Sequence, residues 1–257
     1  MNLSPYKNIK NDEWISITER LIREFPIELG TIAECVDVAW RRVWQTRIGT
    51  DNVIFQLNEI NPPAPVIGYL FEKLFAKELS ILFPEIWRGG SGNEKDVVNI
   101  HDEKFSFEIK TSGQLGTKIY GNRSYGQKVE HTELEKKDKS GYYLTVNFYK
   151  DHINLIRFGW IDANDWRSQN AASGQMASLH KDVYKYKLKK IICPYILKAD
   201  IEIIDNIGTK TAQKFYNLNV YTVGDLLKAN NLPKKLEKLK NTASAYYGAL
   251  EDVRHVF

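Results

Sequence analysis

The sequence has only two cysteines, Cys35 and Cys193, and they do not stand in a CxxC spacing. Their scarcity argues against a disulfide scaffold and against a zinc site built on thiolates, so two free thiols are expected. No stretch approaches the ~18 uninterrupted apolar residues that a membrane span requires. The first residues also lack the apolar segment of a signal peptide. These absences predict a cytoplasmic protein with no membrane partner.

Strong charge of one sign is also missing, since 36 lysines and arginines face 32 aspartates and glutamates, for a net charge of +4. This balance permits nucleic-acid binding but does not demonstrate it, so local clustering matters more than the total. What the sequence does have is a 43% hydrophobic content over 257 residues. That is enough for one large domain or two unequal ones.

Two helical regions are predicted before residue 90. Residues 12–48 have apolar side chains at helical spacing, with Arg41, Arg42 and Arg47 largely off the apolar stripe. Those arginines suit either a solvated face or DNA phosphates. Asn61 is expected to cap a second helix over 66–83, with prolines in its first turn. Its expected buried face consists of Val66, Ile67, Leu70, Phe71, Leu74 and Phe75.

Strands are predicted over 97–100, 105–109, 141–149 and 153–161, after a glycine-rich turn at 84–95. The stretch 182–192 alternates, with Lys185, Lys187 and Lys189 on one face of the expected strand. It suits an edge strand protected by lysines, or a strand that faces DNA.

The pair of strands over 97–109 carries charges that a hairpin does not need. A turn between Asp102 and Glu103 would place Asp96 opposite Ile109, beside Glu108 and Lys110. Because side chains alternate along a strand, Glu108 and Lys110 should share one face while Ile109 faces the core. A surface hairpin with a cross-strand salt bridge is the simpler alternative.

Two neighbouring carboxylates repel each other unless a cation lies between them. Oxygen ligands at this density suit Mg²⁺, which needs only one or two carboxylates and keeps several waters. A lysine beside such a site can position an attacking water and offset negative charge in the transition state. The cluster therefore predicts metal-assisted hydrolysis of a phosphodiester.

The residues Asp96…Glu108-Ile109-Lys110 resemble the PD-(D/E)xK nuclease motif, with Lys95 where the motif's proline would stand. The wider block from Gly92 to Gln127 resembles type II restriction endonucleases, loosely the ScaI-like group. The resemblance covers roughly residues 64–160. It implies that Asp96, Glu108 and the Ile109 carbonyl bind Mg²⁺ and that Lys110 activates the water.

The resemblance also implies an accessory acid from the preceding helix. Glu72 is the first candidate for it and Glu78 the competing one. A polar loop follows the motif and offers side-chain types that bond bases or phosphates; an ordinary solvent loop is the alternative. Its candidate DNA-binding residues are Asn122, Arg123, Ser124, Tyr125 and Gln127.

The segment 201–227 resembles the helix-hairpin-helix motif of DNA-binding proteins. Gly208 would allow its turn, and the amides that begin the next helix would form a phosphate site with Lys210 and Thr211. Such units grip phosphates without reading sequence. A small helical domain used for packing or dimerisation is the alternative.

Together these features predict an α/β fold with a restriction-endonuclease-like core, a mixed β-sheet flanked by helices. The expected division is a helical N-terminal segment (1–60), a nuclease core (61–197) and a small all-α, helix-hairpin-helix-like DNA-binding domain (198–257).

The expected function is type II, Mg²⁺-dependent cleavage of double-stranded DNA at a short palindromic site, leaving 5′-phosphate and 3′-hydroxyl ends. A homodimer and a companion DNA methyltransferase encoded nearby are expected. The alternatives are an XPF-like structure-specific repair nuclease and a non-catalytic DNA-binding module.

Overall fold

The computed structural model describes residues 4–50, 52–122, 139–168 and 176–250. The α-helices are α1 (Trp14–Glu24), α2 (Leu29–Gln45), α3 (Leu57–Ile60), α4 (Ala64–Leu82), α5 (Thr209–Tyr216), α6 (Val223–Lys228) and α7 (Lys234–Tyr247). The strands are β1 (Arg47–Thr50), β2 (Val53–Gln56), β3 (Trp87–Gly89), β4 (Val97–Asn99), β5 (Phe107–Ser112), β6 (Tyr120–Asn122), β7 (Gly141–Tyr149), β8 (His152–Ile161), β9 (Trp166–Ser168), β10 (Met176–Leu179) and β11 (Leu188–Ile191).

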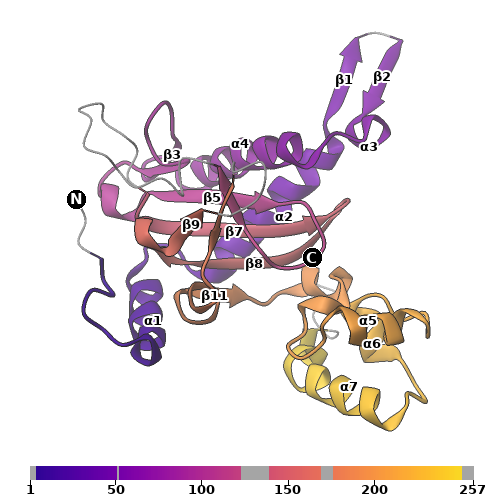
Figure 1. Cartoon of the computed structure of the whole chain (residues 1–257). Coiled ribbons are helices and arrows are strands. Elements are labelled where there is room, and N and C mark those ends of the chain that lie inside the picture. The colour runs from indigo at the N-terminus through magenta and orange to yellow at the C-terminus, as the bar shows by residue number, and fades with distance from the viewer. Residues whose placement is uncertain (1–3, 51, 123–138, 169–175, 251–257) are drawn as a thin grey trace.

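A six-stranded mixed sheet forms the centre of the molecule, in the order β11-β8-β7-β5-β4-β3 (Figure 1). The pair β5–β7 is parallel, and the other neighbouring pairs are antiparallel. Strands β7 and β8 lie inside the sheet and are buried along almost their whole length. Central strands buried on both faces read as near-continuous apolar runs, which is why the sequence identifies these two well.

Helices α2 and α4 cover one face of the sheet and share its main hydrophobic core. Phe107, Ile109, Leu144 and Phe158 contribute to this core from three adjacent strands. On the helix side, Phe71 is one of the fully buried side chains. The alternation along β5 therefore turns its odd-numbered side chains toward the helices and leaves its even-numbered ones on the opposite face.

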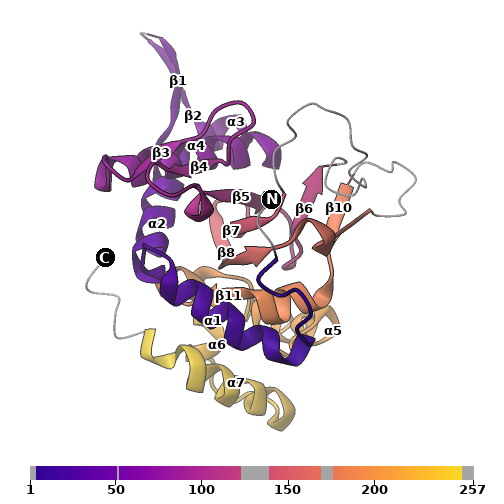
Figure 2. The same cartoon turned by 90° about the vertical axis from the view of Figure 1, so that its left-hand side faces the viewer.

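A second, three-stranded sheet of order β6-β10-β9 lies on that opposite side, and Figure 2 shows β6 and β10 across the central sheet from α2. Its core is separate from the first and includes Ile119, Tyr143, Trp166 and Leu188. The central sheet is thus covered by helices on one face and partly by a small sheet on the other.

The expected continuous helix over 12–48 is wrong. Its path is interrupted between Glu24 and Leu29, where Pro26 lacks the amide that a continuing helix needs. The chain after α2 forms the hairpin β1–β2, which stands away from the body of the molecule in Figures 1 and 2. No sequence signal was recognised for this hairpin.

Helix α4 is close to the expected helix, but two details differ. Asn61 does not cap it: Asn61 ends α3 with a left-handed backbone (φ 50°), and Pro63 precedes α4. Val66 is exposed, not buried. The prolines do lie at its start, as expected. The glycine-rich turn that follows contains the short strand β3, in which Trp87 is buried against the core.

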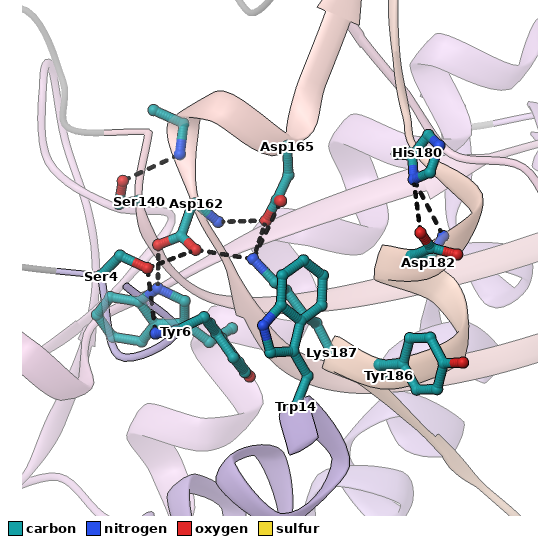
Figure 3. Close-up of polar contacts among 12 residues, drawn as sticks. Ser4, Tyr6, Trp14, Ser140, Asp162, Asp165, His180, Asp182, Tyr186 and Lys187 are labelled. Carbon is teal, nitrogen blue, oxygen red and sulfur yellow. Dashed lines mark hydrogen bonds and ion pairs between the residues drawn. The ribbon is translucent and has the colours of Figure 1, made fainter. Parts of the chain in front are cut away.

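The lysine-rich stretch is a strand only from Leu188 onward, where β11 forms the expected edge of the sheet. Residues Val183–Lys187 form a π-helical turn instead, and Lys187 is buried. Its ammonium lies 2.8 Å from Asp162 Oδ2 and 2.9 Å from Asp165 Oδ2, as Figure 3 shows. Ion pairing with residues far away in the sequence outweighs the local alternation here.

The N-terminal segment closes over this buried lysine (Figure 3). The rings of Tyr6 and Trp14 each have their centroid 4.3 Å from Lys187 Nζ. Ser4 donates a hydrogen bond to Asp162 Oδ2 at 2.8 Å. We call Ser4, Tyr6, Trp14, Lys187 and the two aspartates the Lys187 cluster.

Helices α5, α6 and α7 form the C-terminal part, which lies beside the sheet in Figure 1. They have their own hydrophobic core, in which Ala212 and Phe215 are buried. This core begins at Ile196, near the proposed domain boundary. In the described part of the chain, no helix has the length and apolar content needed to cross a membrane.

Candidate active site

Strands β4 and β5 hold the charged cluster, in a register one residue from the expected one. Val97 pairs with Phe107, so Asp96 lies level with Glu108 and not with Ile109. The connection is wider than a tight turn because Asn99 Oδ1 accepts two backbone amides within it. Asp96 nevertheless reaches the third residue, since its Oδ2 accepts the Ile109 amide at 2.8 Å.

Three oxygens converge on the Lys110 ammonium, as the sequence predicts for this group of residues. Lys110 Nζ lies 3.2 Å from Glu108 Oε2, 3.1 Å from the Ile109 carbonyl oxygen and 3.7 Å from Asp96 Oδ2. The Glu108 side chain is only 1% exposed, whereas the Lys110 side chain is 19% exposed. The cluster therefore has a buried carboxylate at its base and an ammonium that reaches solvent.

Glu72 on α4 lines a hollow that Lys110 also lines. A hollow of about 230 Å³ is lined by Glu72, Tyr69 and Gly68 of α4, by Pro65, and by Ile109–Thr111 of β5. Glu72 Oε1 pairs with Lys73 Nζ at 2.8 Å. This contact raises the pKa of Lys73, and the charge of Asp96 adds to the effect.

Glu78, the competing acid, faces elsewhere. It is buried and pairs with Arg42 of α2 at 2.9 Å. This pair joins α2 to α4, and Glu78 does not line the hollow beside Lys110. Arg42 is therefore engaged within the protein.

Lys95 is a member of the cluster whose part the sequence analysis missed. Its Nζ lies 3.9 Å from Glu108 Oε1 and donates a hydrogen bond to the Ser140 carbonyl oxygen at 3.0 Å. Gly141 has φ 144°, and an added Cβ there would approach Lys95 Nζ to 3.4 Å. Lys95 is thus a second cation beside Glu108. The sequence signal for it was the lysine at the position of the motif's proline.

The donor set fits a hard divalent cation. Asp96, Glu108 and the Ile109 carbonyl offer oxygen only, and their oxygens already surround one cationic group, the ammonium of Lys110. Within residues 4–50, 52–122, 139–168 and 176–250 no group of three or more His, Cys, Asp or Glu residues could hold a metal. Mg²⁺ does not require one, because one or two carboxylates with waters and a substrate phosphate suffice.

The face of the sheet that carries Lys110 continues as a row of polar residues. Lys110 is level with Thr145 on β7, Thr145 with Arg157 on β8, and Arg157 with Lys190 on β11. Arg157 is buried, which lowers its pKa to about 10. Its guanidinium donates to the Thr117 carbonyl oxygen at 2.8 Å and so fixes the chain that leaves β5.

The candidate DNA-binding loop begins just beyond that point. Asn122 ends β6 and is level with Met176 of β10. The remaining candidates of this loop, Arg123, Ser124, Tyr125 and Gln127, lie outside the described residues.

The candidate phosphate site in the C-terminal part is only partly as expected. Gly208 is the N-cap residue before α5, but its φ is −92°, and the left-handed residue of the turn is Asn206 (φ 72°). Lys210 and Thr211 lie in the first turn of α5. The Glu202 carboxylate accepts a hydrogen bond from Thr209 at 3.3 Å and so brings negative charge to the same helix end.

A larger hollow, of about 720 Å³, lies between the sheet and the C-terminal part. Arg157, Tyr184, Lys190 and Gly208 are among its lining residues. The charged cluster is not in it, so size alone does not indicate where the chemistry takes place.

A mixed sheet flanked by helices, with Asp96 and a Glu108-x-Lys110 strand at an open edge of its polar face, defines a nuclease of the restriction-endonuclease-like fold. Residues 4–192 match the family described as ScaI restriction endonuclease. The chain belongs to this family and is a type II restriction endonuclease.

A curated relative supports the same assignment. The type II restriction enzyme ScaI of Streptomyces caespitosus is 36% identical over 186 residues, which cover 68% of this chain and 79% of that protein. The family match ends at residue 192 and therefore does not include α5, α6 or α7. Neither the repair-nuclease alternative nor the non-catalytic one agrees with these findings.

Proposed function

We propose that the chain cleaves both strands of double-stranded DNA at a short palindromic sequence in a Mg²⁺-dependent reaction, leaving 5′-phosphate and 3′-hydroxyl ends. The convergence of Asp96 Oδ2, Glu108 Oε2 and the Ile109 carbonyl oxygen at one point beside Lys110 supports it most directly. Type II restriction endonucleases generally need a divalent metal ion, and this all-oxygen donor set suits Mg²⁺.

Each residue of the cluster has a distinct role in this proposal. Asp96, Glu108 and the Ile109 carbonyl hold the metal ion, which when bound polarises the scissile phosphate. The Lys110 ammonium orients the attacking water, favours loss of its proton and offsets the negative charge that grows on the phosphate. Glu72 lines the same hollow and serves as the accessory acid.

The proposed reaction also implies the oligomeric state, the location and the partners of the protein. Two antiparallel strands require two active sites, so the active form is a homodimer in the cytoplasm. Asn122, the polar loop after it and the start of α5 contact the DNA, with the C-terminal residues 198–257 as a separate DNA-binding domain. A companion methyltransferase, encoded nearby, protects the same site.

The test is cleavage of a plasmid of known sequence in Mg²⁺, followed by sequencing of the ends. Asp96→Ala and Lys110→Ala should each lower the cleavage rate by about 10²–10⁴-fold while DNA binding in Ca²⁺ is kept. Asp102→Ala is the matched control, because Asp102 lies in the same connection but pairs with Lys104 in solvent. Undiminished cleavage by Asp96→Ala would refute the site assignment.

A further inference from the structure

The hairpin β1–β2 exposes both of its strands to solvent. All eight of its strand residues are exposed. It stands away from the rest of the molecule in both views, above α3 and the start of α4 (Figures 1 and 2). An isolated two-stranded hairpin is at best marginally stable in water, so a long-lived arm of this kind needs something to pack on.

The two faces of the hairpin differ in character. Ile48 is level with Phe55 and Thr50 with Val53, so three large apolar side chains share one face. Arg47, Gln56, Gly49 and Ile54 share the other. The apolar face is about half exposed at every one of its large side chains. Contiguous exposed apolar surface of this kind is typical of an interaction site.

The charge of the hairpin favours a protein partner over DNA. Residues 47–56 contain one arginine and one aspartate, so their net charge is zero. Elements that contact DNA derive most of their affinity from neutralising phosphates with lysine and arginine. A neutral ribbon with an isoleucine, a valine and a phenylalanine on one face is instead suited to another apolar protein surface.

We propose that the apolar face of β1–β2 packs against a second copy of this chain, about a two-fold axis. The inference rests on the proposed function only in that double-strand cleavage requires two copies. Two exchanged arms of this size bury on the order of 600 Å², about half of what the smallest stable interfaces bury. The chain that follows the hairpin has further exposed apolar residues, Ile60 on α3 and Val66 and Tyr69 on α4, which the proposed contact includes.

The position of Tyr69 connects this interface with the active site. Tyr69 is exposed, yet it also lines the hollow that contains Glu72 and Lys110. The second copy would therefore lie beside the first copy's charged cluster. Two active sites that cut the two strands of one short DNA site must lie close together in this way.

Two isoleucines of the hairpin provide a matched pair of variants. Ile48 and Ile54 are each 51% exposed, but they lie on opposite faces of the ribbon. Ile48→Ser should weaken the dimer at least ~30-fold in sedimentation velocity, whereas Ile54→Ser should change it less than ~3-fold. Both residues are exposed, and equal melting temperatures would verify that the variants fold.

Each outcome decides between interpretations. A wild-type protein that stays monomeric at micromolar concentration, or an Ile48→Ser variant that dimerises normally, would overturn the inference. Weaker DNA binding in Ca²⁺ with an unchanged dimer would make the hairpin a DNA element instead. Plasmid cleavage is scored separately: an intact dimer without cleavage would contradict the proposed function and leave the interface standing.

Discussion

Removal of the Lys187 ammonium should destabilise the protein strongly. In Lys187→Met the side-chain volume is nearly kept, but Asp162 and Asp165 lose the cation that lies 2.8 and 2.9 Å away. Breaking a buried ion pair by removing one partner costs about 3–5 kcal/mol, because an uncompensated charge stays buried. The loss of the contacts with the rings of Tyr6 and Trp14 acts in the same direction.

The expected change is large enough to measure without ambiguity. For a chain of this size a loss of about 3–5 kcal/mol corresponds to a fall in melting temperature of about 6–20 °C. Urea unfolding followed by tryptophan fluorescence would measure the free energy of unfolding, and Trp14 itself reports on the cluster. A loss below about 1 kcal/mol would refute the argument, because that is the value of a solvated surface pair.

The pH dependence of the same variant tests the cause. Burial raises the pKa of Asp165 already in the wild-type protein, while Lys187 opposes the rise. Without Lys187 the folded state binds a proton at Asp165 more readily than the unfolded state does. The stability deficit should therefore shrink as the pH falls from 8 toward 5. Lys187→Met combined with Asp165→Asn should recover part of the loss, and an equal deficit at all pH values would contradict the electrostatic explanation.

Three further changes test other parts of the molecule. Gly68→Ala should lower cleavage at least ~10-fold, since its Cβ would come within 2.2 Å of Thr111 Oγ1 and push α4 away from β5; a normal rate would show that the helix position is not critical. Lys95→Met should lower the cleavage rate, because Glu108 loses a cation 3.9 Å from its Oε1, and Lys95→Arg should restore part of the rate; an unchanged rate in Lys95→Met would show that this cation is not needed. Burial raises the pKa of the Cys193 thiol to about 11, so iodoacetamide at pH 8 should react with it about 100-fold more slowly in the native protein than in urea; equal rates would mean that the thiol is exposed.

The proximity of the charged groups could be predicted from sequence because they are close together in the chain. Asp96, Glu108 and Lys110 lie within fifteen positions, and strand alternation alone separates Ile109 from its neighbours. The register was wrong by one residue because the wider connection depends on the side chain of Asn99, which accepts two backbone amides. The cluster tolerated that error, since a carboxylate can reach the next residue along the partner strand.

Other features depend on contacts that no local pattern reveals. Lys187 reads as one of several lysines on an edge strand, and its burial requires two aspartates more than twenty positions away. The part of Lys95 depends on Glu108 and on the Ser140 carbonyl, which the fold brings beside it. Of the hairpin β1–β2, only Arg47 and Ile48 lay in the predicted helical stretch, and the remaining strand residues had no predicted structure, because so short a stretch does not separate the two periods.

The parallel pairing of β5 with β7 bears on when the nuclease becomes active during folding. Its partner residues, such as Lys110 and Thr145, are far apart in the chain, and the next strand inward, β8, comes later still. Parallel, non-local pairs form slowly, because a long connection must be closed before any contact rewards it. The strand that carries Glu108 and Lys110 thus gains its fixed place only after β7 has been made and docked. A chain still emerging from the ribosome at residue 112 has every charge of the cluster but lacks β7, the strand beside which β5 is fixed, so we expect it to be inactive until β7 has been made and paired.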